Sequence, residues 1–235
     1  MMMKRISAVT LSMAMAASSL TAFAQNQKLV DRLNAGKEVV TEIMSTPDKG
    51  IPSNILAGAV CVVVIPSYKK GAFIVGAQYG QGVATCRTPH GWSAPVFVQL
   101  AGGSVGFQIG GQATDLILVA MNDQGLQHML KNKFKLGADA AASAGPVGRN
   151  AQAGTDWKLN AEFLTYSRSK GLFAGIDLDG SVLSQNEDDT RAMYGSNVAF
   201  QEVLKGNQVT PPTARPFVST VAKYFVIAKN QQNEK

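Results

Sequence analysis

Short runs of β-branched and alternating residues, separated by glycine or proline, are the feature that most constrains how this chain folds. The chain has 23 glycines, and many of them cluster between these runs. Glycine permits tight turns and close approaches of the backbone, and Asp179-Gly180 is a strong hairpin signal. The predicted strands are residues 60–65, 72–79, 82–87, 92–101, 104–109, 115–121, 136–142, 159–167, 171–178 and 181–185. Such a series predicts a curled, Gly-rich, mainly antiparallel sheet or a partial barrel.

Amphipathic helices are predicted near both ends of the domain. Residues 27–45 and 214–228 each repeat apolar side chains at helical spacing, with polar or charged residues on the other face. The first of these helices packs on the domain core or, alternatively, lies on a membrane surface. Shorter helices are predicted at residues 51–57, 122–132, 187–194 and 197–204. The sequence therefore predicts one α+β domain over residues 25–228, followed by a polar tail at 229–235.

The N-terminal segment has the pattern of a secretory signal peptide. Lys4 and Arg5 precede an apolar run over residues 6–23, and small residues stand at the −3 and −1 positions of a cleavage site, Ala22 and Ala24. Several Ser and Thr residues make the run too polar for a good membrane anchor. No cysteine lies near the site, so we do not expect a lipoprotein. We expect cleavage before Gln25 and a periplasmic or secreted protein.

The two cysteines, Cys61 and Cys86, fall in predicted strands. Export would place them in an oxidising compartment, and their even number favours a disulfide. A simple meander would put the predicted strand 72–79 between them, which argues for caution. Two buried free thiols are the alternative.

The charge of the chain is mildly basic. Removal of Lys4 and Arg5 with the signal segment would lower the formal net charge from +6 to +4. This favours anionic lipid headgroups, whereas the sequence contains no long basic block of the kind that binds nucleic acid. The candidate lipid contacts are basic residues in predicted turns, Lys69, Lys70, Arg149, Arg168 and Lys170. Ordinary solvated loop charge is the alternative interpretation.

The patterns that carry enzyme chemistry are missing from the sequence. His90 and His128 stand apart from any second His, Cys or carboxylate at metal-ligand spacing. The glycine clusters at 102–106 and 110–111 match neither the dinucleotide nor the phosphate-loop spacing, and there is no Gly-x-Ser-x-Gly elbow. We therefore expect no metal, no cofactor and no catalytic activity.

Several strings along the chain resemble the SYLF domain family, also described as a lipid-binding or actin-binding domain family. The most specific are Gly145-Pro146-Val147-Gly148-Arg149 and Ser169-Lys170-Gly171-Leu172-Phe173-Ala174-Gly175, with Gly91-Trp92-Ser93-Ala94-Pro95 earlier in the chain. The resemblance covers roughly residues 30–206 and keeps its order.

The resemblance implies lipid binding, in part through an N-terminal amphipathic helix and basic residues. Some relatives also bind actin filaments. The chain departs from them in its export-type N-terminus and in having no SH3 module within these 235 residues, so actin is an unlikely partner. The resulting expectation is an exported protein that binds anionic lipid or a membrane surface in the bacterial envelope. The alternative is a non-catalytic envelope protein-interaction or structural module.

Overall fold

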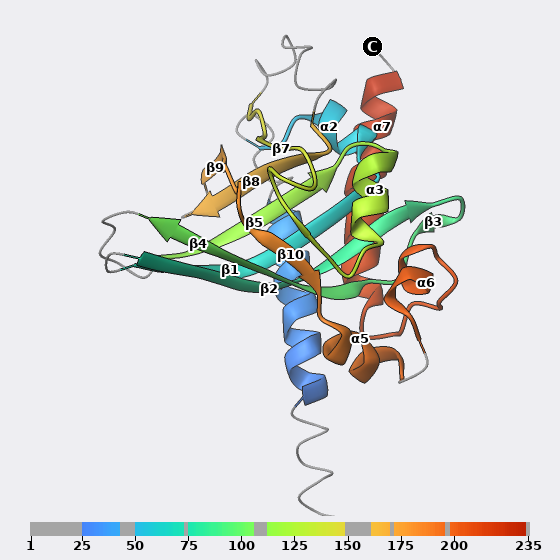
Figure 1. The fold of residues 1–235 in the computed structure, drawn as a ribbon. Coiled ribbons are helices and arrows are strands. Elements are labelled where there is room, and N and C mark those ends of the chain that lie inside the picture. The colour runs from blue at the N-terminus through green and yellow to red at the C-terminus, as the bar shows by residue number, and fades with distance from the viewer. Residues whose placement is uncertain are drawn as a thin grey trace, which may run out of the picture.

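A single mixed sheet, mainly antiparallel, curls into a half-barrel in the computed structural model, and the helices near the two ends of the chain pack together against its outer face (Figure 1). The structure describes residues 25–42, 50–72, 75–105, 112–148, 161–169, 172–195 and 198–233. The predicted signal peptide lies outside the described residues. The α+β class and the curled sheet are confirmed.

The sheet has the strand order β6-β10-β4-β2-β1-β5-β8-β7, with β3 paired to β2 and β9 paired to β8. All described pairs are antiparallel except β7 with β8. The strands are β1 Cys61–Ala72, β2 Val75–Thr88, β3 Gly91–Trp92, β4 Val96–Val105, β5 Gln112–Ala120, β6 Lys133–Lys135, β7 Ala142–Ala144, β8 Phe163–Ser169, β9 Leu172–Gly175 and β10 Val182–Gln185.

Helices flank this sheet on both faces. Residues 25–42 form the N-terminal helix, and the others are α2 Ser53–Gly58, α3 Asp123–Met129, α5 Glu187–Tyr194, α6 Phe200–Leu204 and α7 Arg215–Asn233. Helix α7 therefore continues past Ala228, where the prediction ended it. None of the helices in the described part of the chain combines the length and hydropathy that crossing a membrane requires.

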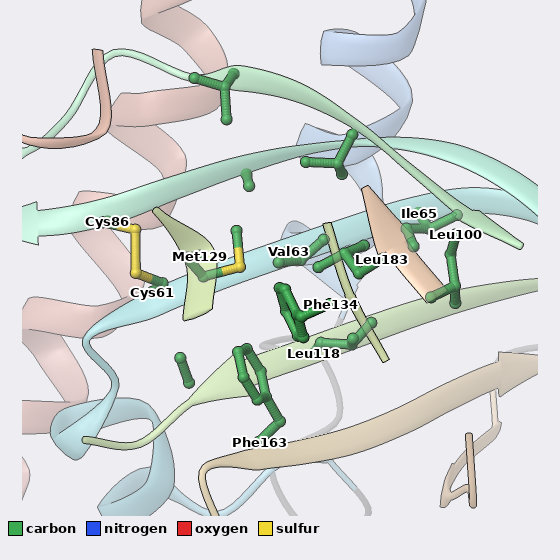
Figure 2. Close-up of a cluster of buried hydrophobic side chains, with 14 of the residues drawn as sticks. Cys61, Val63, Ile65, Cys86, Leu100, Leu118, Met129, Phe134, Phe163 and Leu183 are labelled. Carbon is green, nitrogen blue, oxygen red and sulfur yellow. A yellow bond between two sulfur atoms is a disulfide. The ribbon is translucent and has the colours of Figure 1, made fainter. Parts of the chain in front are cut away.

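Alternate residues of the central strands fill two separate cores. On β1, Val62 and Val64 join an outer cluster beneath the N-terminal helix, α2 and α7. Val63 and Ile65 point instead into the hollow of the curled sheet, where they join an inner cluster shown in Figure 2. Burial on both faces explains why the first part of β1, residues 61–65, is a continuous apolar run.

The inner cluster shows how far the sheet curls. Phe134 on β6 and Phe163 on β8 lie near opposite ends of the strand order, yet their rings stack with centroids 5.2 Å apart (Figure 2). The hollow of the half-barrel is therefore a packed core, filled by inward-facing side chains from strands near both edges of the sheet.

The N-terminal helix is part of the domain core. Its apolar residues Leu29, Leu33, Val39 and Val40 are only 1–2% exposed. At Gly36 a Cβ would lie 3.1 Å from Val83 and 3.3 Å from Phe217, so the helix, β2 and α7 meet closely there. This confirms the packed alternative for the helix in this conformation.

The turn predicted between the strands 72–79 and 82–87, at Gly80-Gln81, is wrong, because β2 runs through it without a break. The neighbouring strand β1 has a bulge between Val64 and Lys69, where Ser67 has φ 56°. A Cβ at Gly80 would lie 2.6 Å from Ile65, and one at Gly82 would overlap the Val64 carbonyl oxygen. These glycines therefore admit the bulge of β1 rather than form a turn.

The uninterrupted β2 makes β1 its direct neighbour, and Cys61 pairs opposite Cys86. The two residues form a disulfide with their Cα atoms 4.0 Å apart, and both are fully buried. The predicted disulfide is confirmed. Because β1 and β2 are adjacent in the sheet, the concern that a simple meander would separate the two cysteines does not apply.

The predicted hairpin around Asp179-Gly180 is also wrong. Gly180 does form a turn with φ 83°, but β9 pairs with β8 and β10 pairs with β4 and β6. Between them the chain crosses the inner face, where Leu178 is buried in the inner cluster and the Gly180 N–H donates to the Leu136 carbonyl. The strand predicted at 136–142 is replaced by a turn closed by a Leu136–Ala140 bridge.

Candidate functional site

One end of the sheet projects beyond the helices and carries the candidate site, on the left in Figure 1. We define the distal sheet end as the row Ala101, Tyr79, Lys69 and Ala113 together with Leu172 on β9. The row follows from strand pairing, since Tyr79 lies opposite both Ala101 and Lys69, and Lys69 lies opposite Ala113. All five residues are exposed.

The row lies on the outer face of the sheet. Tyr79 has the same strand parity as Val83, and Ala113 the same parity as Ile117; both reference residues belong to the outer cluster. Because side chains alternate along a strand, the row continues the outer face past the edge of the N-terminal helix. The helices leave this part of the sheet uncovered.

The distal sheet end is poor in negative charge. The sequence has no acidic residue between Asp48 and Asp115, a stretch that supplies β1 to β4. Arg87, at the other end of β2, donates to the Ala57 and Ala59 carbonyls. The charges of these strands near the distal end are therefore cationic. The absence of acidic residues from this stretch can be found in the sequence, but the alternation pattern of each single strand does not indicate it.

The structure places three of the five predicted lipid contacts. Lys69 is exposed on the outer face of β1, Lys70 follows it in the same strand, and Arg168 lies on β8. The turns predicted for these three residues are therefore wrong, because β1 and β8 extend through them. Lys69 pairs with Ala113 of β5, and Arg168 pairs with Asp115 of the same strand, so both approach the same end of the sheet. Arg149 and Lys170 lie outside the described residues. The lipid-contact role of all five remains a prediction.

Arg168 is a clasp between the sheet and the N-terminal helix. Its guanidinium donates to Asp115 Oδ2 from Nε at 2.8 Å and from Nη2 at 2.5 Å, and Nη1 pairs with Glu42. The side chain is only 18% exposed. Burial lowers the pKa of Arg168, an effect opposed by the negative charge of Glu38. Its charge is thus compensated, which suits a positioning role better than headgroup contact.

Asp115 is held from a second direction. Its Oδ1 accepts the backbone N–H of Ser67 at 2.9 Å, within the bulge of β1. Burial raises the pKa of Asp115, and the Ser67 hydrogen bond opposes that rise. The Asp115 carboxylate therefore connects the bulge of β1 to Arg168. Arg168 in turn pairs with Glu42 at the end of the N-terminal helix.

A second arginine holds the middle of the helix. Arg32 Nη1 pairs with Asp189 Oδ2 of α5 at 2.6 Å, and Nη2 donates to Gln81 Oε1 at 2.8 Å. Its guanidinium also lies 5.4 Å from the Phe97 ring centroid. Two ion pairs at separate points along the helix reinforce its buried apolar face.

The two most specific strings of the sequence meet at Tyr166 on β8. A Cβ at Gly145 would overlap the Tyr166 ring, and one at Gly175 would overlap the Gly145 carbonyl oxygen. The Tyr166 hydroxyl is buried with no hydrogen-bond partner among the described residues, and burial raises its pKa. Gly145 and Gly175 are therefore required by packing, independently of any ligand.

Other polar clusters have structural explanations. His128 Nε2 lies 3.2 Å from Glu162 Oε2 and joins α3 to the start of β8. Within the described residues no group of three or more His, Cys, Asp or Glu side chains is arranged to hold a metal ion. A surface pocket of about 380 Å³ lies near α5 and α6, and two of its charged residues, Glu187 and Arg191, pair with each other.

The fold and the distal sheet end define a class, a single α+β domain whose curled sheet has one exposed end that is poor in carboxylates. The family model that matches residues 101–224 is Ysc84, described as "Las17-binding protein actin regulator". The chain belongs to this family, the Ysc84 or SYLF family, which is associated with lipid and actin binding.

Curated relatives support the assignment. The chain is 35% identical over 178 residues to SH3 domain-containing YSC84-like protein 1 of Rattus norvegicus, covering 74% of this chain and 52% of the relative. The human protein of that name is 34% identical with the same coverage. Protein YSC84 of Saccharomyces cerevisiae is 31% identical over 175 residues, covering 73% of this chain and 37% of the relative. The chain thus spans about half the length, or less, of these relatives.

Proposed function

We propose that this chain is an exported, non-catalytic protein that binds anionic lipid or a membrane surface in the bacterial envelope. The observation that carries the proposal is the distal sheet end, where Lys69 is exposed on β1 and the strands β1 to β4 contain no carboxylate. Membership of a family associated with lipid binding supports it. The actin association of the family is not carried over, because the proposed setting holds no actin.

The proposed binding is weak per charge and depends on salt. A lysine near an anionic membrane surface contributes about 1 kcal/mol, and 0.1 M salt screens exposed charges beyond about 10 Å. A few lysines therefore give modest affinity that falls as ionic strength rises. Binding that survives high salt would require apolar contacts as well.

The proposed setting rests on two features. The N-terminal segment has the pattern of an export signal, and the buried Cys61–Cys86 disulfide suits an oxidising compartment. Periplasm and secretion both satisfy these features. Mass spectrometry of protein from the envelope fraction should find Gln25 as the first residue; a main species that retains Met1 would contradict export.

Flotation of the mature protein with vesicles tests the lipid role. Phosphatidylcholine vesicles with and without phosphatidylglycerol are compared at low and high salt. We expect binding to the anionic vesicles at low salt, and a clear loss for the Lys69→Ala/Lys70→Ala variant. The control is Lys205→Ala/Lys223→Ala, which removes the same charge from exposed positions after α6 and on α7. It should bind within about twofold of the parent.

Two outcomes would contradict the proposal. If both double variants lose binding equally, net charge and not the distal sheet end is responsible. If neither variant changes binding, the electrostatic role is wrong, and a protein-interaction module of the envelope becomes the better account.

A further inference from the structure

Two large apolar side chains stand out at the distal sheet end. Tyr79 on β2 is 48% exposed, and Leu172 on β9 is 62% exposed. Tyr79 keeps its hydroxyl engaged, because it donates to Gln99 Oε1 on β4 at 3.3 Å. Tyrosine and leucine at such an edge gain by entering an apolar layer, and tyrosine suits the boundary with water in particular.

The spacing of these side chains argues for an extended partner. From β2 to β9 the sheet advances by four strands through β1, β5 and β8, which is about 19 Å at the usual strand spacing. Lys69 lies between them on β1. A single small anion cannot touch both ends of this span. Tyr79 projects from the outer face, whereas Leu172 precedes the outer-cluster residue Phe173 on β9 and projects from the other face. A bilayer that the sheet meets end-on can contact both side chains. The cationic character of the strands selects an anionic bilayer.

The N-terminal helix is not free to supply the apolar contact. Its apolar face is buried against the outer cluster, Gly36 sits tightly between β2 and α7, and the clasps of Arg32 and Arg168 hold it. Insertion of this helix would require all of these contacts to break. The exposed side chains of the sheet need no such rearrangement.

We propose that Tyr79 and Leu172 are the apolar anchors of the membrane contact. The domain docks with its distal sheet end on an anionic bilayer, Lys69 meets the headgroups, and the N-terminal helix stays packed. This inference rests on the proposed lipid binding and assigns the surface and the orientation to it.

The orientation is tested with tryptophan as a depth probe. The variants are Leu172→Trp and the control Val209→Trp, and both are compared with the parent protein on anionic vesicles containing brominated lipid. Val209 is 78% exposed and lies in the segment between α6 and α7. Helix α6 is on the right in Figure 1, on the side away from the distal sheet end. We expect added quenching for Leu172→Trp and none for Val209→Trp, because bromine quenches only tryptophans that enter the bilayer.

Affinity gives a second, independent measurement. Tyr79→Ala/Leu172→Ala should weaken binding about tenfold and remove the part that resists high salt, since partial burial of two large side chains is lost. The matched control Val209→Ala/Val226→Ala removes two other exposed apolar side chains and should stay within twofold. Equal thermal midpoints for the variants show that each is folded.

The outcomes separate this inference from the proposed function. If the parent protein binds vesicles but Leu172→Trp is not quenched and Tyr79→Ala/Leu172→Ala binds normally, the anchors are wrong and lipid binding stands. Quenching of Val209→Trp alone would also overturn the orientation. If the parent protein floats with none of the vesicles, the proposed function fails, and the inference fails with it.

Discussion

The two halves of β1 differ sharply, although they belong to one strand. From Cys61 to Ile65 every residue is at most 1% exposed, and the strand is covered on both faces. Beyond the bulge at Ser67, the strand keeps its pairing with β2 and β5 but exposes Lys69 to solvent. The neighbouring strands are the same, and Tyr68 is still buried in the inner cluster, but the outer face is no longer covered at Lys69. A half that is buried on both faces thus supports a half whose outer face is exposed.

The largest expected effect concerns the disulfide of the buried half. The Cys61→Ala/Cys86→Ala variant should lose about 3 kcal/mol of unfolding free energy, because the bridge closes a sequence separation of 25 residues. Urea denaturation measures the loss. Vesicle binding by the fraction that is still folded should be unchanged, since neither sulfur lies at the distal end. A stability equal to the parent's would show that the buried half does not depend on this bridge.

The boundary between the halves is the next target. Gly82→Ala should destabilise the protein by about 2 kcal/mol, because the new Cβ overlaps the Val64 carbonyl oxygen at the bulge. Gly103→Ala on β4 is the matched control, since a Cβ there meets nothing within 4 Å. It should change stability by no more than about 0.5 kcal/mol. Equal effects of the two changes would mean that the bulge does not require glycine opposite it.

The ion pair between Arg168 and Asp115 is tested through the pH dependence of the unfolding free energy. Arg168→Ala should cost about 1.5 kcal/mol at pH 7, because it leaves the Asp115 carboxylate without its charged partner. Burial already raises the pKa of Asp115. The protonated form is therefore favoured in the folded state, and its contribution to stability is present at low pH and lost as the pH rises through that pKa.

The variant should consequently lose more stability relative to the parent at pH 7 than at pH 4. Thermal unfolding at both pH values measures this difference. Arg168→Lys, which keeps one positive charge, should recover part of the loss at pH 7. A deficit that is the same at both pH values would indicate lost packing rather than a lost ion pair.

The smallest effect is expected in the exposed half. Lys69→Ala should change the unfolding free energy by no more than about 0.5 kcal/mol, because an exposed charge in such a position contributes little to folding. It should weaken binding to anionic vesicles at most about fivefold at low salt. A folding defect as large as that of Gly82→Ala would remove the distinction between the two halves.

Local patterns predicted the elements better than their partners. Alternation and helical periodicity located β1, β5, α5 and the two long helices, because those signals depend on neighbours in the sequence. The position of β10 between β6 and β4 depends on the packing of Leu183 in the inner cluster. No local sequence pattern indicates this packing. The sequence likewise indicates a turn at Gly80, because the bulge that this glycine accommodates lies in another strand.

The candidate site was predicted only in part. The basic residues could be named, and Lys69 does lie exposed at a sheet end. Arg168 was placed in a turn, but β8 extends through it, and its partners Asp115 and Glu42 are distant in the sequence. Its role as a clasp therefore could not be deduced from its neighbours. Tyr79 and Leu172 were overlooked because exposure is a property of the folded sheet.

The strand order has a consequence for the timing of folding. The N-terminal helix is seated by Asp189 on α5 and by Phe217 on α7, which are among the last parts of the chain to be made. Strand β10, near the end of the sequence, lies inside the sheet between β4 and β6. Long-range pairings of this kind slow folding, because the connecting loops must close first. We therefore expect the chain to stay unfolded until nearly all of it has been synthesised, a delay that is compatible with the proposed export through a narrow channel.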